Sequence, residues 1–383
     1  MEMEMESVQE PGVSPASLSL PVLVHDLGTD ELMTQYSISS QSLSTVAINE
    51  LRHYRCFETP QGWVLALALH PSPASFQFHT FLWRPEDGER IQLPPKEQGF
   101  PENCKCLLSD MPDAASGCTV VVFDLDDCEI WFCKIGATKW DSDRYEASYK
   151  PTMFLQGKIP TMKNIAMSHA IAAVGGKIYF EVTAYELGVI EFNNGKKKPK
   201  IDTIKVDRVD RLLSVPSASM YFVESRGDLF HVVIIFDGDN VHKIAEHAVY
   251  RMDFSKLAWC EVDEIGGDRV FLLGGDMLGI SCFGASCSAG DRSSGLRGNC
   301  IYFLNHLADT GHFLHVIDLK KGTEQAQRPF KHNGYLMPLR PPFWLLPTRC
   351  TSYRHNNIWR HAKIGLFTFS CIFLFFRFLF GTM

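Results

Sequence analysis

Two aspartates in the first half of the chain have the spacing of a phosphoryl-transfer site. Asp124 follows a β-branched run at residues 118–123, and Asp126 comes two positions later. In phosphotransferases with an aspartyl nucleophile, the first aspartate attacks and the second acts as general acid and base. Such sites have Thr or Val four residues after the nucleophile, where this chain has Cys128, and open a βα unit, whereas a second apolar run follows here at once. The pattern therefore favours an Asp-rich hairpin turn over a catalytic centre.

Two other short motifs also match functional sites only in part. Asp237-Gly238-Asp239-Asn240 is similar to part of a calcium loop, but it has neither the bidentate glutamate nor the flanking helix that such a loop requires. Arg226-Gly227-Asp228 spells an adhesion tripeptide, and it lies between two apolar runs. Glycine beside polar residues is typical of a tight turn, so we interpret both segments as hairpin turns.

The histidines of the C-terminal half include one spacing that a metal ion could use. His312 and His315 lie close together, with His306 and Cys300 nearby, but no second compact pair of ligands accompanies them. The chain has no G-x-S-x-G, P-loop or G-x-G-x-x-G motif, since Gly274, Gly275 and Gly279 have the wrong spacing. We therefore predict no catalytic residues, no cofactor-binding residues, no metal ligands and no cofactor.

The elements that hold these residues are short apolar runs separated by turn residues. The clearest stretch spans residues 250–303, where Gly-Gly pairs and aspartates separate runs at 259–262, 270–273 and 299–304. The polar segment 286–297 is predicted to be a surface loop. Further runs with turn chemistry between them occur at residues 63–69, 76–83, 118–123, 129–134, 169–174, 177–182, 187–192, 219–224, 228–236 and 313–319.

This pattern predicts an all-β fold. Almost no helical periodicity persists beyond a turn or two, which excludes alternating βα units. A long meander of short strands leaves few exposed edges when it closes radially. At roughly 45–50 residues per blade, the body of the chain would form a β-propeller of about six or seven blades. Two stacked β-sandwiches are the structural alternative.

Composition limits the partners and the compartment. The 383-residue chain contains 44 acidic and 37 basic residues and has a pI near 6.1, so no positive face for nucleic acid is expected. Its 12 cysteines are widely spread, and most lie in apolar runs. With no signal sequence, the simplest interpretation is reduced, buried thiols in a cytoplasmic or nuclear protein.

The two ends differ from the body. Residues 1–18 are acidic and then rich in Pro and Ser, which predicts a disordered leader. Residues 19–348 form the predicted propeller domain, and 349–383 are a basic and then hydrophobic tail. Residues 364–383 are largely apolar and about long enough to span a bilayer, although Arg377 opposes insertion. A tail anchor and a tail unrelated to the fold both remain open.

Two stretches of the body carry a family resemblance. One runs from Phe81 to Pro94 as FLWRPEDGERIQLP, and the other combines WCEVDEIGGDRVFL, starting at Trp259, with GNCIYF at residues 298–303. These segments resemble the plant F-box-associated propeller family, the kelch-like domain of the KIB type. The resemblance covers the body of the chain and implies a kelch-like β-propeller.

The resemblance also implies a class of partner. Members with an F-box are similar to substrate receptors of SCF ubiquitin ligases, in which the propeller recognises the substrate, in some members a kinase of the GSK3/shaggy type. An F-box needs roughly 40 residues of helical pattern, which the short polar leader does not supply. We therefore expect no F-box, and binding of a Skp1-type adaptor is not expected.

Two functional hypotheses remain. The first is a non-enzymatic protein-interaction module whose loops bind another protein. The alternative is a propeller enzyme with a site in the central channel, which would need charged residues converging from several blades. We favour the first hypothesis, because the sequence contains no recognisable catalytic set.

Overall fold

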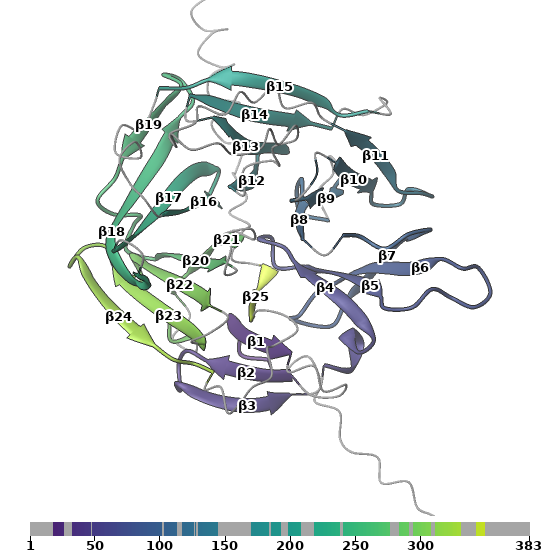
Figure 1. The fold of residues 1–383 in the computed structure, drawn as a ribbon, viewed down its shortest axis with the longest axis horizontal. Helices are drawn as coiled ribbons and strands as arrows, with labels where there is room; N and C mark the ends of the chain where they lie inside the picture. Colours follow the sequence, from purple (N-terminus) through teal and green to yellow (C-terminus); the bar gives the residue numbers. More distant parts are fainter. Residues whose placement is uncertain are drawn as a thin grey trace, which may run out of the picture. The chain divides into compact units, whose positions relative to one another are not determined.

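The computed structural model shows a β-propeller of six blades arranged around a central axis (Figure 1). It describes residues 18–26, 33–46, 48–101, 103–112, 117–125, 127, 129–144, 170–183, 185–192, 198–207, 218–237, 240–275, 283–290, 294–307, 311–330 and 342–348. The predicted all-β propeller is confirmed, and the number of blades is six. The predicted leader and tail lie almost wholly outside the described residues.

Blades 2 to 5 are antiparallel meanders of four consecutive strands. Their strands, from the axis outward, are β4 (Tyr54–Glu58), β5 (Val64–Ala68), β6 (Phe78–Trp83) and β7 (Arg90–Lys96) in blade 2; β8 (Cys104–Leu108), β9 (Thr119–Asp124), β10 (Glu129–Lys134) and β11 (Asp141–Arg144) in blade 3; β12 (Ile171–Val174), β13 (Lys177–Thr183), β14 (Glu186–Glu191) and β15 (Lys200–Lys205) in blade 4; and β16 (Ala218–Ser225), β17 (Asp228–Asp237), β18 (Asn240–Asp253) and β19 (Ala258–Glu261) in blade 5.

Blade 1 joins the two ends of the propeller. β1 (Val22–Asp26), β2 (Met33–Ser37) and β3 (Ser42–Val46) come from the start of the chain, and β25 (Phe343–Leu345) comes from its end. β25 is the innermost strand and pairs antiparallel with β1 (Figure 1). Beyond β25, the Thr348 hydroxyl donates a hydrogen bond to the Glu86 carboxylate in blade 2. The closure therefore depends on segments more than 300 residues apart.

Blade 6 has five strands and a different topology. Its strands are β20 (Arg269–Gly275), β21 (Phe283–Ser288), β22 (Cys300–Leu307), β23 (Gly311–Asp318) and β24 (Thr323–Gln327). β21 is innermost, and β20 lies between β21 and β22, antiparallel to the first and parallel to the second. β21 and β22 would otherwise form an ordinary hairpin, so β20 is an inserted strand.

The innermost strand of blade 6 corrects one sequence prediction. The segment 286–297 was predicted to be a surface loop, but Ser286 belongs to the innermost strand β21 and is buried, as are Ser294 and Leu296. Small residues are required here because β21 packs closely against blade 5. A Cβ atom on Gly284 would lie 2.6 Å from the carbonyl oxygen of Phe222 in β16. This crowding requires glycine at position 284 of β21.

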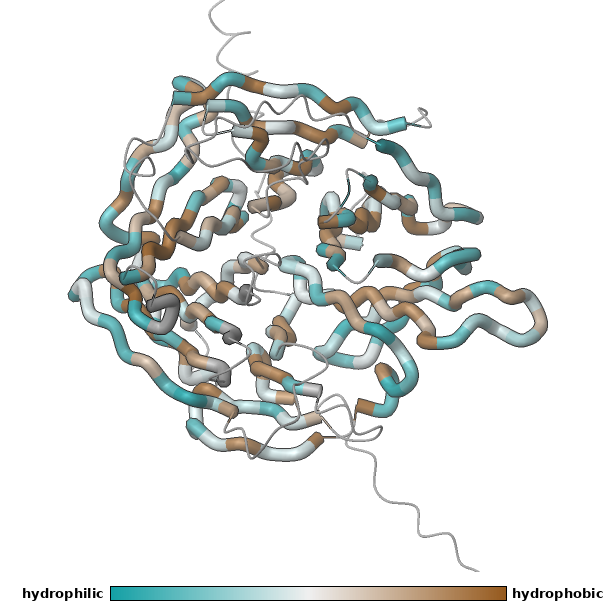
Figure 2. The backbone as a smooth tube through the Cα atoms, in the orientation of Figure 1, coloured by the Kyte–Doolittle hydropathy of each residue, from teal (hydrophilic) through white to brown (hydrophobic). Residues whose placement is uncertain are grey.

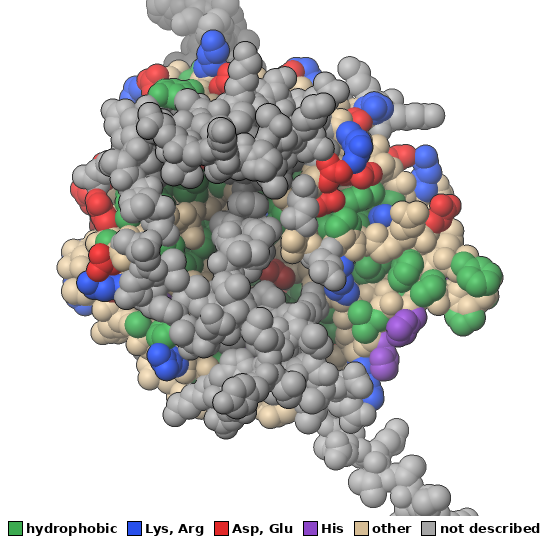
Figure 3. Space-filling model, viewed as in Figure 1, with side chains coloured by type: hydrophobic (Ala, Val, Ile, Leu, Met, Phe, Trp, Pro, Cys, Tyr) green, Lys and Arg blue, Asp and Glu red, His purple; other side chains and the backbone are tan. Residues whose placement is uncertain are grey.

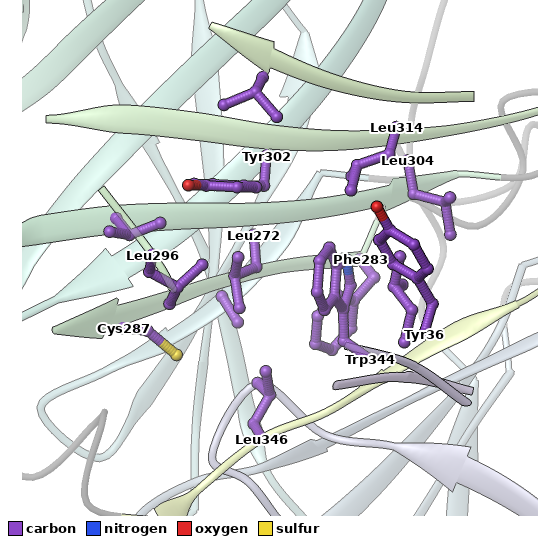
Figure 4. Packing of buried hydrophobic residues seen from close by; sticks show 14 of the residues in the cluster. Tyr36, Leu272, Phe283, Cys287, Leu296, Tyr302, Leu304, Leu314, Trp344 and Leu346 are labelled. Atoms are coloured by element: carbon purple, nitrogen blue, oxygen red, sulfur yellow. The ribbon is translucent and has the colours of Figure 1, made fainter. Parts of the chain in front are cut away.

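The hydrophobic core consists of clusters between neighbouring blades. Figure 2 shows hydrophobic residues concentrated on the inner and middle strands, whereas the outer strands β11 and β24 are mostly hydrophilic. The cluster between blades 6 and 1 includes Tyr36, Leu272, Phe283 and Trp344 (Figure 4). The Trp344 indole is 1% exposed, and its Nε1–H donates to the Leu273 carbonyl at 3.2 Å. One side chain thus joins the closing strand to the inserted strand.

Helical structure is minor in the described part of the chain. A 3-10 turn, η2 (Asn49–Leu51), precedes β4. No helix among the described residues is long and apolar enough to cross a membrane, and residues 364–383 lie outside them. Of the eight cysteines in the described ranges, six are buried, including Cys118, Cys133 and Cys300.

Candidate functional site

The aspartates with phosphotransferase-like spacing lie in a hairpin turn. β9 and β10 pair antiparallel, with Phe123 opposite Ile130, so no βα unit follows Asp124. Asp124 is 6% exposed, and its Oδ1 accepts the backbone N–H of Asp127 at 3.2 Å. Asp126 and Cys128 lie outside the described residues. The Asp124 carboxylate therefore stabilises the turn that follows it, which is a structural role. The predicted hairpin turn is confirmed.

The other two motifs are turns of blade 5, as predicted. Asp237 and Asn240 are paired residues that close the β17–β18 hairpin. Arg226 and Gly227 form the β16–β17 turn with φ angles of +57° and +85°. The Arg226 guanidinium also forms an ion pair with Asp268, next to the start of β20. The tripeptide therefore helps to fasten blade 5 to blade 6.

His315 is held in the sheet of blade 6. It is fully buried, its Nδ1 lies 2.6 Å from Glu324 Oε1, and its ring stacks on Phe303 with the ring centroids 5.6 Å apart. Phe303 is its partner across the β22–β23 pair, so Cys300, three residues earlier, belongs to the opposite face of the sheet. The side chains of His306 and His312 lie outside the described residues. Among the described residues, no three or more potential metal ligands lie together.

Two basic residues of the innermost strands bind backbone carbonyls of neighbouring segments. Lys105 in β8 is 5% exposed, and its Nζ donates to the Ile171 carbonyl in β12 at 3.2 Å. Arg55 in β4 donates to the carbonyls of Phe100 and Pro101 at 2.9 and 2.6 Å. Both side chains therefore connect a blade to its neighbour or to the linker that leads there.

Glu224 is the acidic residue with the largest upward pKa shift. Burial raises its pKa to about 7, while the hydrogen bond from the Gly227 N–H to Oε1, at 2.8 Å, partly opposes this rise. Asp228 also raises the pKa, and Arg269 lowers it. Glu224 lies in β16, and its carboxyl group accepts a hydrogen bond from the same β16–β17 turn that contains Arg226, at the junction between blades 5 and 6.

The most exposed aromatic side chain lies at the tip of blade 2. We call residues 69–77, which connect β5 to β6, the blade 2 tip. Phe76 is 78% exposed there and Leu69 is 53% exposed, the two highest values among the exposed large hydrophobic residues described. In Figure 1 this hairpin projects outward beyond its neighbours. Exposed aromatic side chains on a projecting loop are typical anchors for another protein.

Backbone hydrogen bonds fix the conformation of the blade 2 tip. The Ser72 N–H donates to the Gln77 carbonyl, and the Phe76 N–H donates to the Ser72 carbonyl, both at 2.8 Å. Phe76 has a φ of +55°, in the left-handed region that bulky residues rarely adopt. The sequence predicted a strand from residue 76, but β6 begins at Phe78, so Phe76 belongs to the loop. In the sequence, only Gln77, which separates Phe76 from the apolar run, indicated that Phe76 lies outside the strand.

The surroundings of the blade 2 tip are basic and rich in histidine. Residues 59–85 contain no aspartate or glutamate. The Leu69 N–H donates to the His53 carbonyl at 2.9 Å, which brings the segment before β4 against the tip. Figure 3 shows hydrophobic side chains on the projecting hairpin, with histidine and basic side chains beside it. The exposed residues near the tip that carry this character are Arg52, His53, His70 and His79.

A family model for the KIB1-4 beta-propeller matches residues 35–327. This chain belongs to that family. The KIB-type membership predicted from the sequence is confirmed. The match omits β1 and β25, the two strands whose pairing closes this KIB1-4 propeller. No curated protein matches the sequence.

Solved structures resemble the chain only remotely. The N-terminal domain of Nup159 is 9% identical, with a TM-score of 0.32, over 80% of this chain and 89% of that one. The WD40 domain of SCAP from fission yeast is 10% identical, with a TM-score of 0.33, over 80% and 84%. The β-propeller domain of the Trilobed protease from Pyrococcus furiosus is 9% identical, with a TM-score of 0.31, over 82% and 94%. These values carry no argument about function.

Proposed function

We propose that this KIB1-4 propeller is a non-enzymatic protein-interaction module and that the blade 2 tip is part of its binding surface. The observation that carries the proposal is the 78% exposure of Phe76 on a hydrogen-bonded loop. Phe exposes a large apolar area, and burying such a side chain in a partner contributes strongly to binding. The loop conformation is already fixed, so little ordering accompanies binding.

The backbone at Phe76 supports a role beyond folding. A bulky residue at positive φ costs about 1 kcal/mol or more, and glycine or asparagine would avoid most of that cost. Phe76 contributes no burial in return, because it is mostly exposed. Strain of this kind is typical of positions retained for function.

The family suggests the class of partner. By resemblance to F-box-associated propellers, we propose a protein partner, with a kinase of the GSK3/shaggy type as the first candidate. We propose that the propeller binds this partner directly. We place this activity in the cytoplasm or nucleus, with membrane anchoring through residues 364–383 as the alternative.

A direct binding measurement tests the proposal. The full chain and its Phe76→Ser variant would be titrated against a purified GSK3/shaggy-type kinase by calorimetry. We expect Phe76→Ser to weaken binding about tenfold or more, as expected for loss of an interface anchor. Tyr185→Ser is the matched control, since Tyr185 is 51% exposed on blade 4. Equal affinities of the wild type and Phe76→Ser would refute the role of the tip, and no binding by either would refute this partner.

A further inference from the structure

The outer edges of the six blades differ in their protection. In the described part of the chain, the outermost strand of each blade has a neighbouring strand on one side only. Charged residues and prolines on such an edge discourage pairing with another chain. Five blades carry them in the outermost strand: Arg90, Pro94, Pro95 and Lys96 in β7, Asp141, Asp143 and Arg144 in β11, Lys200, Asp202 and Lys205 in β15, Glu261 in β19, and Glu324 in β24.

β3, the outermost strand of blade 1, has no such protection. Its sequence is SLSTV, and residues 32–49 contain neither a charged residue nor a proline. Ser42, Leu43, Ser44 and Thr45 are exposed, Leu43 to 47%, whereas Val46 is buried. An uncharged, exposed strand edge presents backbone N–H and C=O groups ready to pair with a further strand.

The structure holds β3 in place for such pairing. All five of its residues pair with β2, from Ser37 opposite Ser42 to Met33 opposite Val46. The Gln35 side chain also donates to Ser44 Oγ at 2.9 Å. β2 is itself tied to blade 6 through the Tyr36 hydroxyl, which donates to Gln327 Oε1 at 2.9 Å. Because the edge is already ordered, pairing costs little conformational entropy.

We propose that β3 pairs antiparallel with β3 of a second copy of this chain across a two-fold axis at Ser44. This register pairs all five residues, and each Leu43 lies opposite Thr45 of the second copy on the same face. The pairing brings no like charges together, which would destabilise it. The edge is thus complementary to itself, so β3 of a second copy can pair with its backbone N–H and C=O groups.

The same geometry limits the assembly to a dimer. A two-fold contact uses the same surface on both copies, so it closes after two subunits. One pair of five-residue strands is a small interface, and we expect a dissociation constant of roughly micromolar order. The two four-stranded blades would then form one continuous sheet. This inference is independent of the proposed binding role of the blade 2 tip.

The first test measures mass against concentration. The full chain would be studied by analytical ultracentrifugation, together with its Ser44→Lys variant. The introduced lysines would face each other at the two-fold axis, so we expect a wild-type monomer–dimer equilibrium and a variant that dimerises at least tenfold more weakly. A wild type that stays monomeric, assembly beyond the dimer, or self-association unchanged by Ser44→Lys would overturn the proposal. Thermal unfolding checks that the exposed substitution leaves the fold intact.

The second test identifies the register by disulfide formation. Only residue 44 meets itself in the proposed pairing, so under oxidation Ser44→Cys should form a covalent dimer faster than Ser42→Cys, whose partner would be Val46. Thr203→Cys, in the middle of the charged outer strand β15, is the matched control. The wild type gives the background of the native cysteines. Equal rates for Ser44→Cys and Thr203→Cys would contradict pairing at β3.

Discussion

Trp344 and Phe76 show two opposite uses of an aromatic side chain in this propeller. Trp344 is 1% exposed at the junction of blades 6 and 1, where it fills the core cluster and donates a hydrogen bond to Leu273. Phe76 is 78% exposed at the blade 2 tip, in a backbone conformation unfavourable for its size. The junction stabilises the ring of blades, whereas the tip gains nothing in stability from its aromatic group. Substitutions should therefore separate stability from binding.

Trp344→Ala should have the largest effect. Removing a fully buried indole leaves a cavity between the closing strand and the inserted strand, so we expect a loss of about 3–5 kcal/mol in the free energy of unfolding. Denaturant unfolding followed by fluorescence measures the change. Trp344→Phe should lose clearly less, because most of the apolar volume remains. An equally small loss for both variants would mean that the closure does not depend on this side chain.

Glu224→Gln should remove a pH-dependent destabilisation at the junction of blades 5 and 6. Burial raises the Glu224 pKa from 4.5 to about 7, so the folded state binds a proton more tightly than the unfolded state. Stability is then highest below pH 4.5 and falls as the pH rises towards 7, by about 3 kcal/mol. The glutamine variant should exceed the wild type above pH 7 and match it near pH 4. Denaturation midpoints across this range would show whether the difference appears.

His231→Phe should act in the opposite direction, removing a loss of stability that occurs as the pH falls. Burial lowers the His231 pKa from 6.5 to about 4, and neither ring nitrogen has a hydrogen-bond partner among the described residues. The unfolded state therefore binds the proton more tightly, and stability present above pH 6.5 is lost as the pH falls towards 4. Phenylalanine fits the aromatic surroundings of Phe222, Tyr250 and Trp259 and carries no charge. We expect the variant to retain stability at pH 4, and a wild-type acid profile would contradict this.

Phe76→Asn should have the smallest effect on stability. Asparagine tolerates positive φ better than phenylalanine, so we expect unchanged stability or a gain of up to about 1 kcal/mol. The same substitution should remove the anchor at the blade 2 tip and so weaken binding of the partner. Trp344→Phe should do the opposite, lowering stability and leaving binding unchanged. Thermal unfolding and kinase titration of the same samples would test the two properties together. A clear loss of stability would show that the tip has a structural role instead.

Local chemistry explains which parts of the fold could be predicted. The turns at Asp124, Arg226 and Asp237 were identified because turn residues act through their own backbone, and the adjacent antiparallel pairs were therefore identified as well. The insertion of β20 between β21 and β22 was missed, because sequence proximity favours a plain hairpin. The burial of Ser286 was missed because it comes from blade 5, where Ser225 Oγ lies 2.8 Å from Ser286 Oγ.

The candidate surfaces could be predicted even less well. Phe76 was assigned to a strand, and only the hydrogen bonds between Ser72 and Gln77 place it in the loop. β3 has no functional motif, and its importance emerges from comparison with five other outer strands. Exposure of an edge depends on which strand lies outermost, a property that alternation of residues does not encode.

The sequence by itself determined the all-β class, the positions of many turns and the KIB-type family, because these depend on residues close together in the chain. Only the tertiary structure decided the number of blades, the closure of β25 on β1, the inserted strand and the identity of the exposed edges. Those features depend on contacts between segments up to more than 300 residues apart, where the packing of neighbouring blades selects one pairing among several that the local pattern allows.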